Sequence, residues 1–266
     1  MHVLFWTTGA VGHDDVTRLA GAPLAAGAPY PYVFPPAGTQ NVLYRGVDRH
    51  VHGLFWTFGA VGHDDLTALS GAAPPIGDPF AYVVDALGLQ NALYVGGAGN
   101  PQFAIRHLHQ LFWSSGPVGD RDLTNLSGAP NPSELSTPTA YVAKVDGLQH
   151  AIYVGGDSHV HELFWSTGAV GHDDLTNASH APLPVAGGTP AAYFVASDGT
   201  QHVVYRDGMN HIRDLWWTVG AVTDDDLTAA ASAPNAVGSP SAYIGLDKKQ
   251  HVIYRTSDGH LHELLH

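Results

Sequence analysis

Short apolar segments separated by turn-forming residues run along the whole chain. In residues 191–228, the segments AAYFVA (191–196), QHVVYR (201–206) and HIRDLWW (211–217) are separated by Ser-Asp-Gly-Thr and by a turn that begins Asp-Gly. The segments are rich in β-branched and aromatic residues, and the separators favour tight turns. We therefore predict three antiparallel strands followed by a short fourth segment in AVTDDDLT (221–228). No stretch has an apolar periodicity long enough to predict a helix.

This unit recurs at a nearly constant spacing. Near-copies of HVHELFWSTGAVGHDDLT (159–176) occur at residues 1–17, 50–67, 108–124 and 211–228, and an incomplete copy, HLHELLH, occupies 260–266. The aligned tryptophans are Trp6, Trp56, Trp113, Trp165 and Trp217. A period of 50 to 57 residues indicates a repeat architecture, and four short strands per repeat are typical of a β-propeller blade. The sequence predicts an all-β fold with one domain over residues 1–266, a five-bladed β-propeller of four-stranded antiparallel blades.

The two ends of the chain carry parts of one repeat. Residues 243–255 supply a first and a second strand, and residues 14–17 supply a fourth, so we expect the closing blade to come from both termini. Two segments match the third strand of this blade, residues 2–6 and residues 260–266. This overlap is consistent with a fragment of a longer array or an engineered repeat array, and an unpaired end strand can also be exchanged between chains to form an oligomer.

Composition narrows the classes of partner. The formal net charge is −13, and a surface of that sign repels phosphate backbones, so we expect no nucleic-acid partner. The chain has no cysteine, which excludes disulfides and thiolate nucleophiles. No apolar run reaches the roughly 18 residues of a membrane span. No signal peptide is recognisable, which is compatible with secretion only if a leader has been removed, and the compartment is left open.

The hairpin of the second and third strands carries a resemblance to a known family. Tyr153 is followed by Glu162 and Trp165, Tyr254 is followed by Glu263, and Asp258-Gly259 occupies the turn. This pattern resembles the fucose-binding β-propeller lectins of fungi and bacteria. The whole repeat also looks like a bacterial family of propeller repeats of poorly defined function, and five blades are similar to the tachylectin type. The resemblance implies sugar sites between blades, built from a second-strand Arg, a third-strand Glu and aromatic rings.

The residues at the matching positions define the candidate sites. The Arg-like positions hold Asn41, Asn91, His150, His202 and His251, and the Glu-like positions hold Gly53, Gln110, Glu162, Asp214 and Glu263. Valine occupies the place of a second aromatic ring five residues past each Trp. We expect the acids or amides and the His or Asn side chains to bond sugar hydroxyls while Trp6, Trp56, Trp113, Trp165 or Trp217 stacks on the sugar. The group His150, Glu162 and Trp165 is the favoured site, followed by His202, Asp214 and Trp217.

Two further motifs have a chemical and a structural interpretation. His-x-His at residues 50/52, 107/109, 159/161 and 260/262 places both rings on one face of a strand, where they can chelate a transition metal or pack between blades. Arg213 replaces the second His in another repeat, which argues against a uniform metal role. Gly-His-Asp-Asp ends in an Asp that recurs in all five repeats, as a turn-forming acceptor of backbone N–H groups or as a calcium ligand. We favour the structural interpretation for both motifs and predict no metal and no cofactor.

The function that this pattern favours is non-enzymatic, multivalent binding of glycans or glycoconjugates through inter-blade sites. The first alternative is a structural or protein-interaction propeller without a small ligand, which the recurring valines favour. The second alternative is an enzyme that uses the central channel, which the uniform first strands (YVF, YVV, YVA, YFV and YIG) argue against. Catalytic motifs such as Gly-x-Ser-x-Gly or a P-loop do not occur in the sequence.

Overall fold

The computed structural model describes residues 1–5, 10–97, 105–134 and 136–265. The chain divides into two compact units, Met1–Ile105 with His109–Arg121, and Arg106–Leu108 with Asp122–His266. Each unit is built from antiparallel sheets in which sequential strands are neighbours. None of the helices in the described residues is long and apolar enough to cross a membrane.

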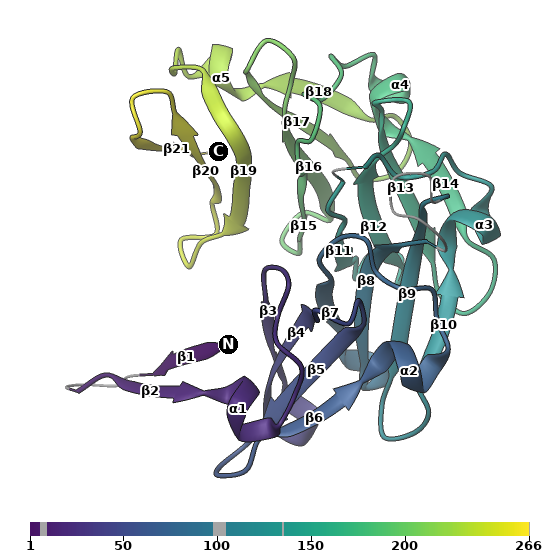
Figure 1. Cartoon of the computed structure of the whole chain (residues 1–266). Helices are drawn as coiled ribbons and strands as arrows, with labels where there is room; N and C mark the ends of the chain where they lie inside the picture. The colour runs from purple at the N-terminus through teal and green to yellow at the C-terminus, as the bar shows by residue number, and fades with distance from the viewer. Residues whose placement is uncertain (6–9, 98–104, 135, 266) are drawn as a thin grey trace. The chain divides into compact units, whose positions relative to one another are not determined.

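The first unit contains a two-stranded sheet and two four-stranded sheets, of orders β1-β2, β3-β4-β5-β6 and β10-β9-β8-β7. The last sheet includes residues 107, 108 and 122, which are grouped with the second unit. The elements, labelled in Figure 1, are β1 (His2–Phe5), β2 (Gly12–Asp15), α1 (Val16–Ala20), β3 (Tyr30–Phe34), the 3₁₀ turn η1 (Pro35–Ala37), β4 (Thr39–Arg45), β5 (Val51–Trp56), β6 (Gly62–Asp65), α2 (Leu66–Ser70), β7 (Phe80–Val84), η2 (Asp85–Leu87), β8 (Leu89–Gly96), β9 (His107–Trp113) and β10 (Gly119–Asp122).

The second unit contains two four-stranded sheets and one three-stranded sheet, of orders β11-β12-β13-β14, β15-β16-β17-β18 and β19-β20-β21. Its elements are α3 (Leu123–Ser127), β11 (Thr139–Val142), β12 (Gln149–Val154), β13 (Val160–Trp165), β14 (Gly171–Asp174), α4 (Leu175–Ser179), β15 (Ala191–Val195), β16 (Thr200–Arg206), β17 (Ile212–Trp217), β18 (Thr223–Asp226), α5 (Leu227–Ala230), β19 (Ala236–Ile244), β20 (Gln250–Thr256) and β21 (Leu261–Leu265). The all-β class is confirmed, and four of the six sheets in the described residues are four-stranded and antiparallel as predicted, whereas the sheets at the two ends of the chain have two and three strands.

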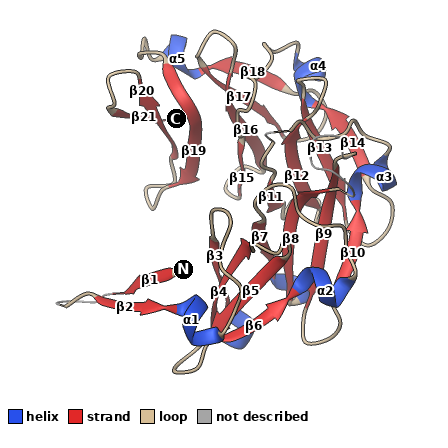
Figure 2. Cartoon of the chain, in the orientation of Figure 1, coloured by secondary structure: helices blue, strands red, loops and turns tan. Residues whose placement is uncertain are grey.

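The Asp-Leu-Thr segment forms a one-turn helix, which the sequence analysis did not predict. Short helices follow the fourth strands in Figure 2. In α3, Asp122 is the N-cap and its carboxylate accepts the backbone N–H of Asn125, three residues on. Leu123 is buried, and the Thr124 hydroxyl accepts the backbone N–H of Leu108 at 2.8 Å. The motif is therefore a helix cap and a link to the third strand, as the structural interpretation expected.

A second recurring contact ties each second strand to the chain segment before its sheet. The buried tyrosine of that strand donates its hydroxyl to a backbone carbonyl in all five repeats. The pairs are Tyr44 to Pro23, Tyr94 to Ala73, Tyr153 to Pro130, Tyr205 to Pro182 and Tyr254 to Pro234. Each bond fixes the connection between two sheets and satisfies a hydroxyl that would otherwise be buried without a partner.

Candidate functional site

The strand register decides which predicted site residues share a face. In the β12–β13 pair, His150 lies opposite Phe164 and Glu162 lies opposite Ile152, so all four side chains point to one face of the sheet. Trp165 lies opposite Gln149 and points to the other face. His150 and Glu162 are brought together, with Nδ1 and Oε1 2.8 Å apart. Trp165 does not join them, so the expected grouping of these three residues in one hairpin is corrected.

The tryptophan on the His150 and Glu162 side comes from the following sheet. Trp217 of β17 packs in one apolar cluster with Tyr141 and Ile152. Tyr141 also donates its hydroxyl across to Oε1 of Gln201 at 2.9 Å. This site is therefore formed by one face of the β11–β14 sheet and the opposite face of the β15–β18 sheet.

The same bond between adjacent sheets occurs at two other places. The first-strand tyrosine donates to the second-strand glutamine of the next sheet from Tyr32 to Gln90 and from Tyr193 to Gln250, each at 2.7 Å. Burial raises the pKa of both tyrosines well above the ordinary value, so their hydroxyls stay protonated donors at neutral pH. The glutamine recurs as Gln40, Gln90, Gln149, Gln201 and Gln250. The recurrence of this glutamine is visible in the sequence, but it was not used to predict these contacts between sheets.

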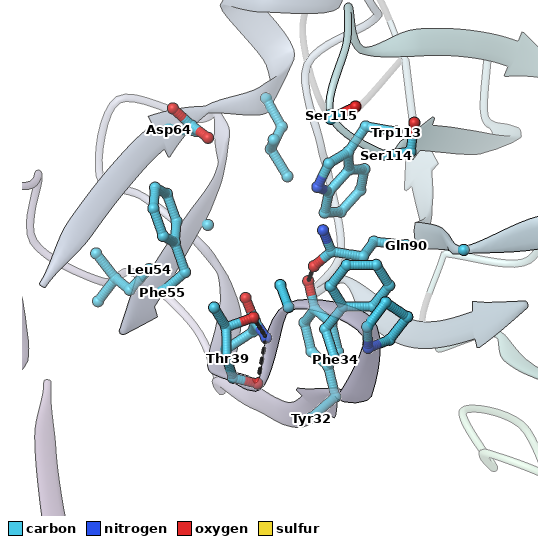
Figure 3. Close-up of a pocket in the computed structure, with 16 residues that line it drawn as sticks. Tyr32, Phe34, Thr39, Leu54, Phe55, Asp64, Gln90, Trp113, Ser114 and Ser115 are labelled. Atoms are coloured by element: carbon cyan, nitrogen blue, oxygen red, sulfur yellow. Dashed lines mark hydrogen bonds between the residues drawn. The ribbon is translucent and has the colours of Figure 1, made fainter. Parts of the chain in front are cut away.

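Between the β3–β6 and β7–β10 sheets lies a cavity of about 490 Å³. Figure 3 shows Phe55 and Asp64 on one side of it and Trp113 and Gln90 on the other. Asn41 also lines it and is held by hydrogen bonds from its amide to the carbonyl and hydroxyl of Thr39. Four aromatic side chains, those of Tyr32, Phe34, Phe55 and Trp113, therefore line one hollow together with the planar polar groups of Asn41, Asp64 and Gln90.

Gly53, which has no side chain, lines this cavity. Gly53 occupies the position of Glu162, and Asn41 occupies the position of His150. In the β11–β14 sheet those two positions are filled by a buried pair whose His150 ring stacks on Tyr141 with centroids 4.9 Å apart. Burial raises the pKa of Glu162, and its hydrogen bond with His150 works in the opposite direction. The favoured site of the sequence analysis is thus closed by its own side chains.

A second and smaller cavity, of about 270 Å³, lies between the β15–β18 and β19–β21 sheets. Tyr193, Asp214, Gln250 and Glu263 line it. His202 Nδ1 lies 2.8 Å from the buried Asp214 carboxylate, which again joins a predicted histidine with its predicted acid. This cavity combines acids and amides, whereas Phe55 and Trp113 face the larger one.

His251 lies in a similar arrangement of the β19–β21 sheet. Its Nδ1 is 2.7 Å from Glu263 and its Nε2 is 3.0 Å from Asp247. Hydrogen bonds to Glu263 and then to Asp247 raise the pKa of His251. Its ring also stacks on Tyr243, so the Tyr-His-acid arrangement of the β11–β14 sheet is repeated here.

The remaining predicted residues have other places. Gln110 donates its amide to the Tyr82 hydroxyl and to Oδ1 of Asn91, which fills the corresponding face of the β7–β10 sheet. Trp56 packs with Tyr44 and Leu54 in an apolar cluster. Trp6 lies outside the described residues. Their roles in sugar binding stay predictions.

Known structures of the same fold come from fungi and bacteria. No protein-family profile matches the sequence, and a search of curated proteins finds no relative. BP39L lectin from Burkholderia pseudomallei is 14% identical with a TM-score of 0.67, over 90% of this chain and 67% of that one. The lectin of Aleuria aurantia, a six-bladed β-propeller with a described fucose recognition mode, is 12% identical with a TM-score of 0.62, over 91% and 73%. AofleA from Arthrobotrys oligospora is 15% identical with a TM-score of 0.61, over 91% and 69%.

The chain has the fold of these β-propeller lectins. The TM-scores of 0.61 to 0.67 establish the shared fold, whereas identities of 12–15% leave the ligand to the residues of the site. The propeller predicted from the repeat is confirmed, and its blades place Tyr32, Asn41, Gln90 and Trp113 around one cavity.

Proposed function

We propose that this protein is a non-enzymatic, carbohydrate-binding propeller whose principal site is the cavity between the β3–β6 and β7–β10 blades. The observation that supports it is the pairing of Phe55 and Trp113 across a hollow that also presents Asn41, Asp64 and Gln90. A sugar ring has apolar C–H faces that stack on aromatic rings and hydroxyls that bond planar amides and carboxylates. The combination suits a monosaccharide or the end of a glycan.

Further sites between blades would make the binding multivalent. The cavity between the β15–β18 and β19–β21 blades offers Asp214, Gln250 and Glu263 to a second sugar residue. The His150 and Glu162 side chains fill the site between their blade and the next, so we expect a sugar to bind there only if this pair moves. Binding at unequal sites still gains avidity on a surface that presents many glycans.

We also propose that the five repeats close into a five-bladed ring. Within the described residues, the β19–β21 sheet has three strands and lacks a fourth, and the β1–β2 sheet lacks a first and a second strand. The proposed fifth blade takes β19, β20 and β21 from the C-terminal side and β2 from the N-terminal side, with β1 displaced from its partner. Exchange of the same strands between two chains is the alternative.

A glycan array on labelled protein at neutral pH, with and without EDTA, tests the proposed function. We expect binding to a coherent set of sugars that does not change with EDTA. A blank array with a folded sample contradicts carbohydrate binding.

Protein interaction is the second candidate function. The Phe58 side chain, in the β5–β6 turn, is 99% exposed, and Val219 at the same place in the β17–β18 turn is 87% exposed. An exposed apolar side chain in the turn of a blade suits a partner protein that docks on that blade. This candidate gains support if the array is blank.

A further inference from the structure

Two groups of histidine and aspartate side chains lie where the third and fourth strands pair, away from the cavities. The β5–β6 histidine cluster consists of Asp48, His50, His52, His63 and Asp65. His52 Nδ1 and His63 Nε2 face each other at 3.0 Å. In a tetrahedral site with metal–nitrogen bonds of about 2.0–2.1 Å, two ligand nitrogens lie roughly 3.3 Å apart, so this spacing is close to that of a chelating pair.

The other ring nitrogen of His52 is already held by a carboxylate. Its Nε2 lies 2.9 Å from Asp48 Oδ1, and the ring is fully buried. Donation from Nε2–H to Asp48 leaves the lone pair on Nδ1, directed toward His63. A carboxylate that orients an imidazole in this way is a common partner of metal-binding histidines.

Two carboxylates also lie beside His52. One candidate ligand atom each of Asp48, His52 and Asp65 lie within 4.8 Å of one another. Asp65 is itself oriented by His50, whose Nδ1 lies 2.7 Å from Oδ2. The cluster therefore combines a facing pair of imidazole nitrogens with carboxylates next to the His52 ring.

The arrangement recurs in another blade with the same geometry. The β13–β14 histidine cluster consists of Asp157, His159, His161, His172 and Asp174. His161 Nδ1 and His172 Nε2 are 3.0 Å apart, and His161 Nε2 lies 3.0 Å from Asp157. Asp157, His161 and Asp174 again form a three-ligand group.

In a third blade, an arginine side chain occupies the place of the histidine pair. Arg213 of β17 occupies the position of His52 and His161, and its guanidinium donates to Asp224 and to Asp226. Asp224 stands where His63 and His172 stand, and Asp226 matches Asp65 and Asp174. Where the histidine pair is lost, a fixed positive charge between two carboxylates replaces it.

We propose that each histidine cluster binds one divalent transition metal of the zinc, nickel or copper class. In the β5–β6 cluster the protein ligands are His52 Nδ1 and His63 Nε2, and in the β13–β14 cluster they are His161 Nδ1 and His172 Nε2. Imidazole ligands suit these ions, and the remaining positions are left to water. None of these histidines lines the two cavities described above, so the proposal does not rest on the sugar site.

The test measures zinc uptake by untagged full-length protein after EDTA treatment, by calorimetric titration with Zn²⁺ and elemental analysis. A His2→Gln background removes the exposed His2–His13 pair, whose ring nitrogens are 2.7 Å apart. We expect two equivalents of zinc in this background and none in H63Q/H172Q. The matched control, His109→Gln, removes a histidine that faces Asp120 in place of a second imidazole and should leave two equivalents bound.

A variant of the supporting carboxylates gives a second readout. D48N/D157N keeps all proposed ligands and should weaken zinc binding by about 10- to 100-fold without abolishing it. Circular dichroism of each metal-free variant verifies that it is folded. The proposal is overturned if H63Q/H172Q takes up as much zinc as the His2→Gln protein from which it is made. It is also overturned if the His2→Gln protein takes up no zinc at a concentration of about 100 μM.

Discussion

At the residue scale, the absence of one side chain distinguishes the larger cavity from the filled sites. Gly53 lies where other repeats carry Gln110, Glu162, Asp214 or Glu263. Those residues bond a histidine, an asparagine or a tyrosine of their own sheet, whereas Gly53 leaves Phe55 and Trp113 to face each other across open space. We expect variation at this position to affect how well each site accepts a ligand.

The stacking role of Trp113 predicts a loss of affinity on truncation. Trp113→Ala removes one aromatic wall of the cavity, and we expect the glycan dissociation constant to rise by about tenfold or more, since that factor corresponds to about 1.4 kcal/mol. Isothermal titration with a glycan from the array measures it. Trp56→Ala is the matched control because Trp56 is the equivalent residue of the preceding blade and packs in a different cluster. Equal losses in both variants would contradict a specific role for Trp113.

The pKa of His251 is a second prediction at this scale. Its hydrogen bonds to Glu263 and Asp247 raise the pKa above the ordinary histidine value. Because the folded-state pKa is the higher one, this pair contributes to stability fully below the ordinary pKa, and the contribution is lost as pH rises through the raised pKa. NMR titration, with the resonance assigned from H251Q, should show the raised value, and Glu263→Gln should lower it. A His251 pKa that is unchanged in E263Q contradicts the proposed effect of Glu263. Glu134→Gln is the control variant.

At the element scale, the one-turn helices show what periodicity in a sequence can and cannot predict. The strand expected at 201–206 is β16 (Thr200–Arg206), because β-branched and aromatic residues between turn-forming residues define a strand locally. Helix α3 has only five residues, too few for an apolar period, yet its start and end are marked by Asp122 and Gly128. The recurring Asp was recognised as an acceptor of backbone N–H groups, but the helix that it caps was missed.

The cap predicts a measurable loss of stability. Asp122→Ala removes the acceptor for the Asn125 N–H and the partner of His107, so unfolding should become easier by about 0.5–2 kcal/mol. Urea denaturation followed by circular dichroism measures the change. Leu126→Ala on the same helix alters an exposed side chain and should change stability by roughly 0.5 kcal/mol or less. A D122A protein as stable as L126A would show that the cap does not stabilise the blade.

At the scale of the whole molecule, the proposed closing blade can be tested with a disulfide. Glu162 lies opposite Asp173 in the β13–β14 pair, and the equivalent residues at the two ends are Glu263 and Asp14. The chain has no cysteine, so D14C/E263C introduces a single pair. We expect oxidation to give a monomer with faster mobility on a non-reducing gel. A covalent dimer would instead indicate strand exchange, and the absence of any cross-link would contradict pairing of β2 with β21.

The sites could be predicted from the sequence only within one hairpin. The repeat pattern predicted the pairing of His150 with Glu162 and of His202 with Asp214, because both members of each pair lie on adjacent strands. The position of Trp113 or Trp217 beside the preceding blade became clear only from the packing of two sheets in the structure. That packing depends on contacts between residues far apart in the chain, which a single sequence does not specify.

The most direct test of the account is calorimetric titration of an array-selected glycan into wild-type protein, Gly53→Ala and Gly53→Glu. A Cβ at residue 53 would lie 3.6 Å from Leu43 and 3.7 Å from Leu66, which is ordinary contact, so G53A should fold, and circular dichroism verifies that G53E is folded. We expect G53A to keep most of its affinity and G53E to lose binding at the larger cavity, since its carboxylate fills the space as Glu162 does in its own blade. Wild-type affinity and stoichiometry in a folded G53E protein would place the sugar site elsewhere.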